Sequence, residues 1–183
     1  REFKEIRIIS GGFGNKSHPT QALIDISTLY SFDKLTDTST PVTYVGDVKH
    51  SRVFESGRHL LNLLGYKVGV FTDQNLLPDN KNDLEIYESW DEVFENSNSI
   101  ELLRVQKERM LDIEKINFDN YIKNYQLTKK ILDKSQKDLI VLHPMPNNIG
   151  IESSEDAIED TKIKYIDQLS YAISSRIAAY KYV

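Results

Sequence analysis

The chain has 183 residues, a length at which one compact domain buries roughly 70% of the surface its unfolded form exposes, without metals or disulfides. Its 28 acidic and 23 basic side chains give a net charge of −5, which argues against nucleic acid or an anionic membrane surface as a partner. Cysteine is absent, which excludes disulfides, thiolate nucleophiles and Cys-ligated zinc. The sequence contains no run of about 18 apolar residues, the length needed to cross a bilayer. We expect a soluble, cytoplasmic protein.

The amino end predicts a chain cut inside a larger protein. It starts with Arg1 rather than Met and enters almost at once an apolar run at 6–9, which predicts a buried strand. These first residues lack the basic region, apolar stretch and small-residue cleavage site of a signal peptide.

Short apolar runs rich in β-forming residues recur along the chain, and stretches with helical spacing separate most of them. The runs lie at 6–9, 42–45, 67–71, 99–103 and 139–142. Because strands that alternate with helices form βαβ units, this order predicts an α/β fold with a mostly parallel sheet.

Three stretches have the apolar spacing of amphipathic helices: 18–30, 51–64 and 165–182. Pro19 suits the first turn of the first helix, and Gly65 suits the position just past the end of the second. The third has Ile166, Leu169, Ile173, Ile177 and Tyr180 on one face, without Gly or Pro inside. We expect that face to need a partner.

Two segments predict irregular structure. Residues 76–84 are polar and contain Pro78 and two asparagines, which is typical of a surface loop. Residues 110–137 mix charged and aromatic residues with short helical stripes, which predicts a long, partly helical excursion.

The first candidate site is the glycine-rich segment at 11–21, between a predicted strand and a predicted helix. Glycines allow a ligand to approach the backbone, and the start of a helix offers unpaired N–H groups to an anion. The spacing fits neither the dinucleotide fingerprint nor the Walker loop. On spacing alone, a phosphate-binding loop and an ordinary tight turn are equally well supported.

Two further clusters, 46–52 and 103–109, each follow a predicted strand and contain arginine. Ligands of open α/β sheets bind beyond the carboxyl ends of the strands, so Arg52 and Arg104 could together hold a dicarboxylate by bidentate hydrogen bonds. The alternatives are a helix N-cap at Ser51 with solvated charges around it, and a solvated charged turn at 104–109.

The fourth cluster is His143-Pro144-Met145-Pro146 after the last predicted strand. Two prolines around Met145 restrict the backbone, whose carbonyls could then recognise an amide NH₂ group. A structural X-Pro turn is the alternative, and either proline could follow a cis bond.

Taken together and in this order, HPTQALID at 18–25, GDVKHSR at 46–52, RVQKER at 104–109 and HPMP at 143–146 resemble aspartate carbamoyltransferases. Ornithine carbamoyltransferases are expected to have a Cys in the first motif and HCLP in the last, whereas this chain has Thr20 and no cysteine. The resemblance implies an α/β three-layer sandwich and a transferase of pyrimidine biosynthesis. The reaction is transfer of the carbamoyl group of carbamoyl phosphate to L-aspartate, with no metal or organic cofactor.

The resemblance also implies roles for residues around the carbamoyl group. His18 would polarise the carbamoyl carbonyl and stabilise the developing oxyanion. Gln21 and the backbone carbonyls of Met145 and Pro146 would hold the carbamoyl amide. Aspartate would be bound by Arg52, Arg104 and Gln106, and such a site works chiefly by orienting two substrates.

The resemblance divides the chain into three parts. Residues 1–33 would be a remnant of the carbamoyl-phosphate domain with its linking helix, 34–160 the aspartate-binding domain, and 161–183 a helix that returns to the carbamoyl-phosphate domain. The family's Ser-Thr-Arg-Thr phosphate motif would lie upstream, in a missing amino-terminal domain, and the full-length chains would form a homotrimer. The isolated chain is therefore expected to be inactive.

Two positions depart from the family pattern: Leu103 stands where Thr is usual, and Asn147 stands where Arg is usual. These departures lend some support to an alternative, a non-catalytic binding or assembly module with the same scaffold. A transcarbamoylase for another amino acid is opposed by the pair Arg52 and Arg104.

Overall fold

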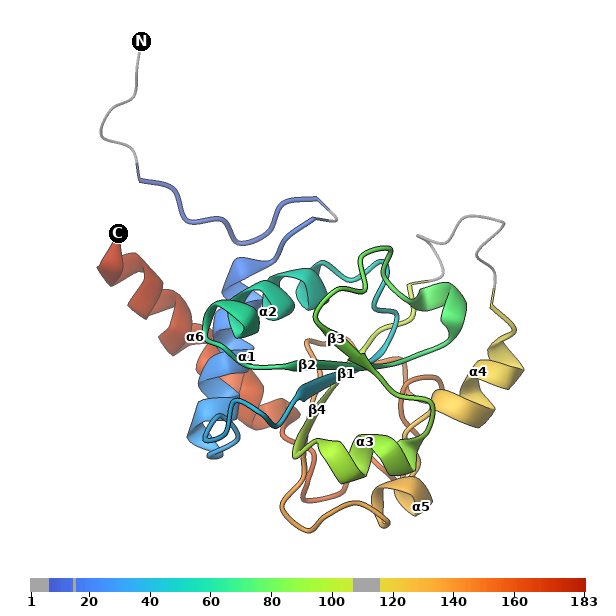
Figure 1. The fold of residues 1–183 in the computed structure, drawn as a ribbon. Helices are drawn as coiled ribbons and strands as arrows, with labels where there is room; N and C mark the ends of the chain where they lie inside the picture. The colour runs from blue at the N-terminus through green and yellow to red at the C-terminus, as the bar shows by residue number, and fades with distance from the viewer. Residues whose placement is uncertain (1–6, 15, 107–115) are drawn as a thin grey trace.

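A computed structural model describes residues 7–14, 16–106 and 116–183. Five strands form one parallel sheet in the order β3-β2-β1-β4-β5 (Figure 1). They are β1 (Val42–Gly46), β2 (Val68–Phe71), β3 (Leu84–Ile86), β4 (Ser99–Leu103) and β5 (Ile140–Leu142). The predicted α/β class and mostly parallel sheet are confirmed.

Helices cover both faces of the sheet, which makes three layers (Figure 1). They are α1 (Pro19–Ser31), α2 (Arg52–Leu63), α3 (Trp90–Asn96), α4 (Phe118–Tyr125), α5 (Lys129–Leu132) and α6 (Tyr165–Tyr182), with a 3₁₀ turn at Gln74–Leu76. On one face Leu29 of α1 and Phe54 of α2 pack on the strands, and on the other Trp90 of α3 and Leu132 of α5 do so.

The central strands are buried along their whole length because both faces of the sheet are covered. This is why four of the five strands, β1, β2, β4 and β5, could be recognised in the sequence as apolar runs. Strand β3 was missed, since it is a three-residue edge strand that is only partly buried. It begins at the last residue of the predicted loop at 76–84.

The strand predicted at 6–9 is wrong for residues 7–9, which have no regular structure; Ile6 lies outside the described residues. Ile8 is 83% exposed. An apolar run becomes a strand only where a neighbour satisfies its backbone groups, and the described part of the sheet offers none to this segment.

The predicted helices are confirmed, and their ends follow from local chemistry. Ser51 caps α2, because its side chain accepts a hydrogen bond from the backbone N–H of Phe54. Gly65, just beyond α2, has a φ of 84°, a left-handed conformation that glycine adopts without steric cost. The excursion at 110–137 contains α4 and α5, while residues 107–115 lie outside the described residues.

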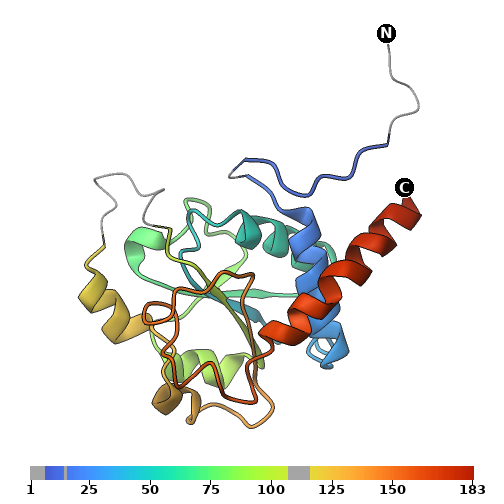
Figure 2. The ribbon, with the colours of Figure 1, turned by 180° about the vertical axis from the view of Figure 1, so that it is seen from behind.

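Helix α6 lies against α1 in both views and runs out past the body of the domain (Figure 2). The side facing α1 is formed by small and polar groups, with Ser175 Oγ 3.1 Å from Ser27 Oγ. The other side exposes to solvent the five apolar residues of the predicted face. They are 49% to 80% exposed: Ile166, Leu169, Ile173, Ile177 and Tyr180. Among the described residues, no helix combines the length and hydropathy of a membrane span.

Candidate active site

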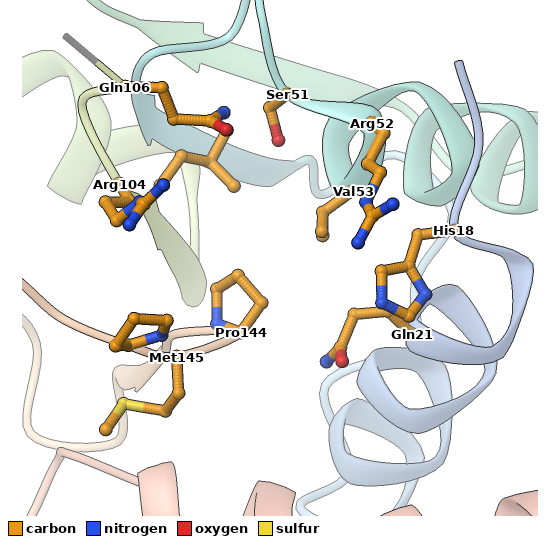
Figure 3. Close-up of a pocket in the computed structure, with 11 residues that line it drawn as sticks. His18, Gln21, Ser51, Arg52, Val53, Arg104, Gln106, Pro144 and Met145 are labelled. Atoms are coloured by element: carbon orange, nitrogen blue, oxygen red, sulfur yellow. The ribbon is translucent and has the colours of Figure 1, made fainter. Parts of the chain in front are cut away.

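A cavity of about 210 Å³ lies beyond the carboxyl ends of β1, β4 and β5, next to the start of α1 (Figure 3). Its lining includes all seven residues to which the resemblance gives a role in the site. The lining residues are His18, Gln21, Ser51, Arg52, Val53, Leu103, Arg104, Gln106, Pro144, Met145 and Pro146. Arg104 and Gln106 face Arg52 and His18 across an open centre (Figure 3).

Arg52 stands on the first turn of α2, where Ser51 caps the helix as predicted and Arg52 lines the cavity; the binding of a carboxylate by Arg52 stays a prediction. One nitrogen of its guanidinium, Nη1, donates to the carbonyl oxygen of Gly14 at 3.0 Å. Gly12 lies close by, with a φ of 149°, and a Cβ there would come within 3.2 Å of Nη1. The glycine-rich segment forms a tight turn that orients Arg52; a role in phosphate binding stays a prediction.

Gln106 follows β4 and is held by the loop after β1. Its backbone N–H donates to Oδ2 of Asp47 at 3.1 Å, and its side-chain Nε2 donates to the carbonyl oxygen of His50 at 3.2 Å. Asp47 is fully buried, and its other oxygen, Oδ1, accepts from the backbone N–H and the ring of His50. Sequence analysis quoted Asp47 in its motif but gave it no role.

A second buried carboxylate, Glu152, joins the loop after β4 to the loop after β5. It accepts hydrogen bonds from the backbone N–H of Val105 at 2.8 Å and of Asn148 at 2.6 Å. Burial raises the pKa of Glu152, although these hydrogen bonds favour the ionised form. Sequence analysis missed this residue, because a lone glutamate in a polar loop gives no signal of burial.

His18 precedes α1, and its backbone N–H donates to Ser56 Oγ of α2 at 2.7 Å. Burial lowers the pKa of His18, and the positive charges of Arg52 and Arg176 lower it further. The imidazole is therefore neutral near pH 7. Its Nδ1 lies 3.5 Å from the hydroxyl of Thr20, so a tautomer with the proton on Nε2 can donate a hydrogen bond into the cavity.

The loop after β5 brings Pro144, Met145 and Pro146 to the cavity, with a cis peptide bond between Met145 and Pro146. The backbone N–H of Met145 donates to Nδ1 of His143 at 2.9 Å. Burial lowers the pKa of His143 to about 3, with a smaller effect from Arg104, so its ring is neutral and Nδ1 can accept.

The two unusual positions have separate surroundings. Leu103 is buried and lines the cavity beside Arg104. Asn147 donates from Nδ2 to Ser153 Oγ at 2.7 Å, within its own loop. Lys107, Glu108 and Arg109, the end of the third motif, lie outside the described residues. In the part of the chain that the structure describes, no group of three or more His, Asp or Glu side chains could hold a metal ion.

Residues 38–183 match the family model of the aspartate/ornithine carbamoyltransferase Asp/Orn binding domain. The chain belongs to the aspartate/ornithine carbamoyltransferase family. The aspartate carbamoyltransferase catalytic subunit of Oceanobacillus iheyensis is 35% identical over 179 residues, which cover 97% of this chain and 56% of that protein. The one from Aquifex aeolicus is 32% identical and covers 97% of this chain and 60% of its own length. The resemblance drawn from the four motifs is confirmed.

Solved structures of the family share the fold. The catalytic subunit of M. jannaschii aspartate transcarbamoylase superposes with a TM-score of 0.79 at 26% identity, over 98% of this chain and 60% of that one. Aspartate transcarbamoylase from Trypanosoma cruzi in complex with carbamoyl phosphate gives 0.74 at 25% identity, over 92% and 56%. The chain thus spans a little more than half the length of the family members it matches.

Proposed function

We propose that this chain is the aspartate-binding part of an aspartate carbamoyltransferase, which transfers the carbamoyl group of carbamoyl phosphate to the amine of L-aspartate. The products are N-carbamoyl-L-aspartate and phosphate. The observation that supports this most directly is the shared cavity, which two guanidinium groups, a glutamine amide and a neutral imidazole line together.

Aspartate fits the cavity by charge and geometry. A guanidinium binds a carboxylate through two parallel hydrogen bonds, and Arg52 and Arg104, on opposite sides of the cavity, supply one such group for each carboxylate of a dicarboxylic acid (Figure 3). Gln106 adds an amide on the side of Arg104. Because Asp47 and Gly14 hold Gln106 and Arg52 from behind, part of the cost of ordering these side chains is met before the ligand arrives.

The carbamoyl group fits the part of the cavity formed by His18, Gln21, Met145 and Pro146, which we call the carbamoyl-binding wall. A neutral His18 can donate from Nε2 to the carbamoyl carbonyl oxygen, where negative charge develops as the aspartate amine attacks. The carbamoyl NH₂ group needs acceptors, which Gln21 and the backbone carbonyls of Met145 and Pro146 can provide. The substrates would then meet at the centre of the cavity, and the chain would act mainly by orienting them.

Phosphate has few ligands among the described residues, and we propose that the remaining ones come from an amino-terminal domain of the same polypeptide and from a neighbouring subunit. Residues 1–33 would belong with that domain, 34–160 would form the aspartate-binding domain, and 161–183 would return to the first domain. The active form would be a cytoplasmic homotrimer of full-length chains. A non-catalytic module with the same scaffold is disfavoured, because such a module has no need for this set of polar groups in one cavity.

The test is to join the chain to the amino-terminal part of the Oceanobacillus iheyensis relative and to assay carbamoyl transfer. The isolated chain should form no carbamoyl aspartate, whereas the joined protein should form it with release of phosphate, and an Arg104→Ala version should lose activity. A folded, assembled joined protein that binds carbamoyl phosphate but never carbamoylates aspartate would reject the proposal. Turnover by the isolated chain would refute the idea that its site is incomplete.

A further inference from the structure

A buried polar network lies directly behind the carbamoyl-binding wall. Gln21 Nε2 donates to Oδ1 of Asp25 at 2.8 Å, and Gln168 Nε2 of α6 donates to the same oxygen at 2.7 Å. The other end of the Gln168 amide, Oε1, accepts from the backbone N–H of His143 at 2.9 Å. All four residues are buried. One carboxylate therefore connects α1, α6 and the loop after β5.

Both ends of this network reach the cavity. Gln21 lines it directly, and His143 immediately precedes the lining residues Pro144 and Met145. A second cavity of about 210 Å³ lies on the α6 side of Gln21. Because there is space on both sides of the Gln21 side chain, packing alone does not determine its direction, and the hydrogen bond to Asp25 does.

The direction of the Gln21 amide follows from the chemistry of Asp25. An ionised carboxylate only accepts hydrogen bonds, so the amide nitrogen of Gln21 must face it and the amide oxygen is left to accept from a ligand. A reversed amide would set two acceptor oxygens against each other in a buried place, which is costly.

Glu101 of β4 keeps Asp25 in this accepting role. Both carboxyls are buried; burial raises the pKa of Glu101 well above its usual range, and the negative charge of Asp25 raises it further. Burial raises the pKa of Asp25 less, to about 7, since the two glutamine amides favour its ionised form. Glu101 therefore retains its proton more readily than Asp25, and Oδ1 of Asp25 accepts from both glutamines.

We propose that Asp25 is a positioning residue for carbamoyl recognition: it turns the Gln21 amide oxygen toward the NH₂ group of the ligand and, through Gln168, sets the loop that contributes Met145 and Pro146. The proposal rests on the proposed function, which assigns the carbamoyl group to this wall. It predicts that the network affects carbamoyl phosphate and leaves aspartate binding alone, because Arg52, Gln106 and the backbone of Val105, next to Arg104, are held by other groups.

The substitution Asp25→Asn tests this, because it preserves the shape of the side chain but leaves one acceptor oxygen and adds a donor. In the joined protein described above, the KM for carbamoyl phosphate should rise about tenfold or more, as expected for a misdirected amide, while the KM for aspartate stays within about twofold. Gln168→Met removes the hydrogen bonds to Asp25 and His143 but leaves the one between Gln21 and Asp25, so it should raise the same KM by a smaller factor. Thr28→Val removes a buried hydroxyl of α1 outside the network and should change neither KM.

A purely structural Asp25 would give a different result, namely a lower melting temperature for Asp25→Asn with both KM values unchanged, and that outcome would overturn the proposal. If Asp25→Asn does not fold, an unchanged KM for carbamoyl phosphate in Gln168→Met would do the same. Side-chain amide NMR of the 183-residue chain provides a test without turnover: the Gln21 Nε2 protons should be protected from exchange in the wild type and lose protection in Asp25→Asn. An inactive wild-type joined protein with a protected Gln21 amide would reject the function, whereas an active one with an unprotected Gln21 amide would reject the positioning role.

Discussion

The buried carboxylate of Asp47 accepts a hydrogen bond from the backbone N–H of Gln106 at 3.1 Å, although 59 positions separate the two residues in the sequence. Asp47 follows β1 and Gln106 follows β4, and these strands are neighbours in the sheet. The contact therefore joins the loop that leads to Arg52 with the segment that contains Arg104. It explains how two motifs far apart in the sequence line the same cavity.

The two arginines that line the cavity, Arg52 and Arg104, should determine affinity for aspartate. Arg104→Lys keeps the charge but removes the planar fork, so we expect the KM for aspartate in the joined protein to rise about tenfold to a hundredfold with little change in the KM for carbamoyl phosphate. Arg58→Lys is the matched control, because Arg58 binds the backbone carbonyls of Asn80 and Asn82 away from the cavity. It should lower stability without changing either KM. Equal changes in both KM values for Arg104→Lys would contradict the assignment.

Gly46 ends β1 beside Leu103 and has a φ of 122°, a conformation that side chains rarely adopt. A Cβ at this position would lie 2.3 Å from the backbone oxygen of Leu103. Gly46→Ala should therefore lower the free energy of unfolding by about 2 to 4 kcal/mol, because backbone cannot move aside as a side chain can. Gly11→Ala, where no atom lies within 4 Å, should have little effect in the same urea titration. A neutral Gly46→Ala would show that the two strand ends can separate.

The buried Glu101 should make stability depend on pH. Its folded pKa lies above the usual 4.5, so the unfolded chain releases a proton that the folded chain retains. As pH rises above 4.5, this group lowers the free energy of unfolding by about 1.4 kcal/mol per unit until its folded pKa is reached. Glu101→Gln keeps a hydrogen-bond donor at this position but has no proton to release on unfolding, so its stability does not fall in this way as pH rises. Relative to the wild type, it should stabilise the chain more at pH 8 than at pH 5.

Urea unfolding at the two pH values measures this difference, which we expect to be about 1 to 3 kcal/mol. Exposed Glu95 on α3 provides the control, because Glu95→Gln should change stability by little at either pH. If Glu101→Gln were equally destabilising at both pH values, the pKa of Glu101 in the folded chain would not be raised as inferred.

The exposed face of α6 should act in assembly rather than in the stability of this domain. The double substitution Ile173→Lys and Ile177→Lys should leave the melting temperature of the chain nearly unchanged, because both side chains are already largely exposed. It should reduce association measured by light scattering, since exposed apolar patches of this kind mark contact sites. Ser175→Lys on the opposite side of the helix should instead destabilise the packing on α1. A large loss of stability in the double variant would mean that this face is covered within the chain.

Local sequence patterns were sufficient for most of the secondary structure, and the resemblance to a family supplied seven of the cavity residues. Strands covered on both faces are mostly apolar, as in Val42–Gly46, and helix boundaries follow from Pro19, Ser51 and Gly65. Each of the four motifs lies where a strand ends or a helix begins. Since parallel strands direct their carboxyl ends to one edge of the sheet, the meeting of these motifs could be predicted before any distance was known.

Only the tertiary structure decided what an apolar or charged residue does when its partner is distant in sequence. The segments 6–9 and 42–45 were both predicted to be strands, but among the described residues only the second has strands on either side. Glu101, Asp25 and Glu152 look like ordinary surface acids in the sequence, and the fold buries all three. Burial and hydrogen bonding depend on the neighbours that folding brings together. Burial by those neighbours raises the pKa of each of these carboxyls. The same neighbours place Asp25 behind the carbamoyl-binding wall.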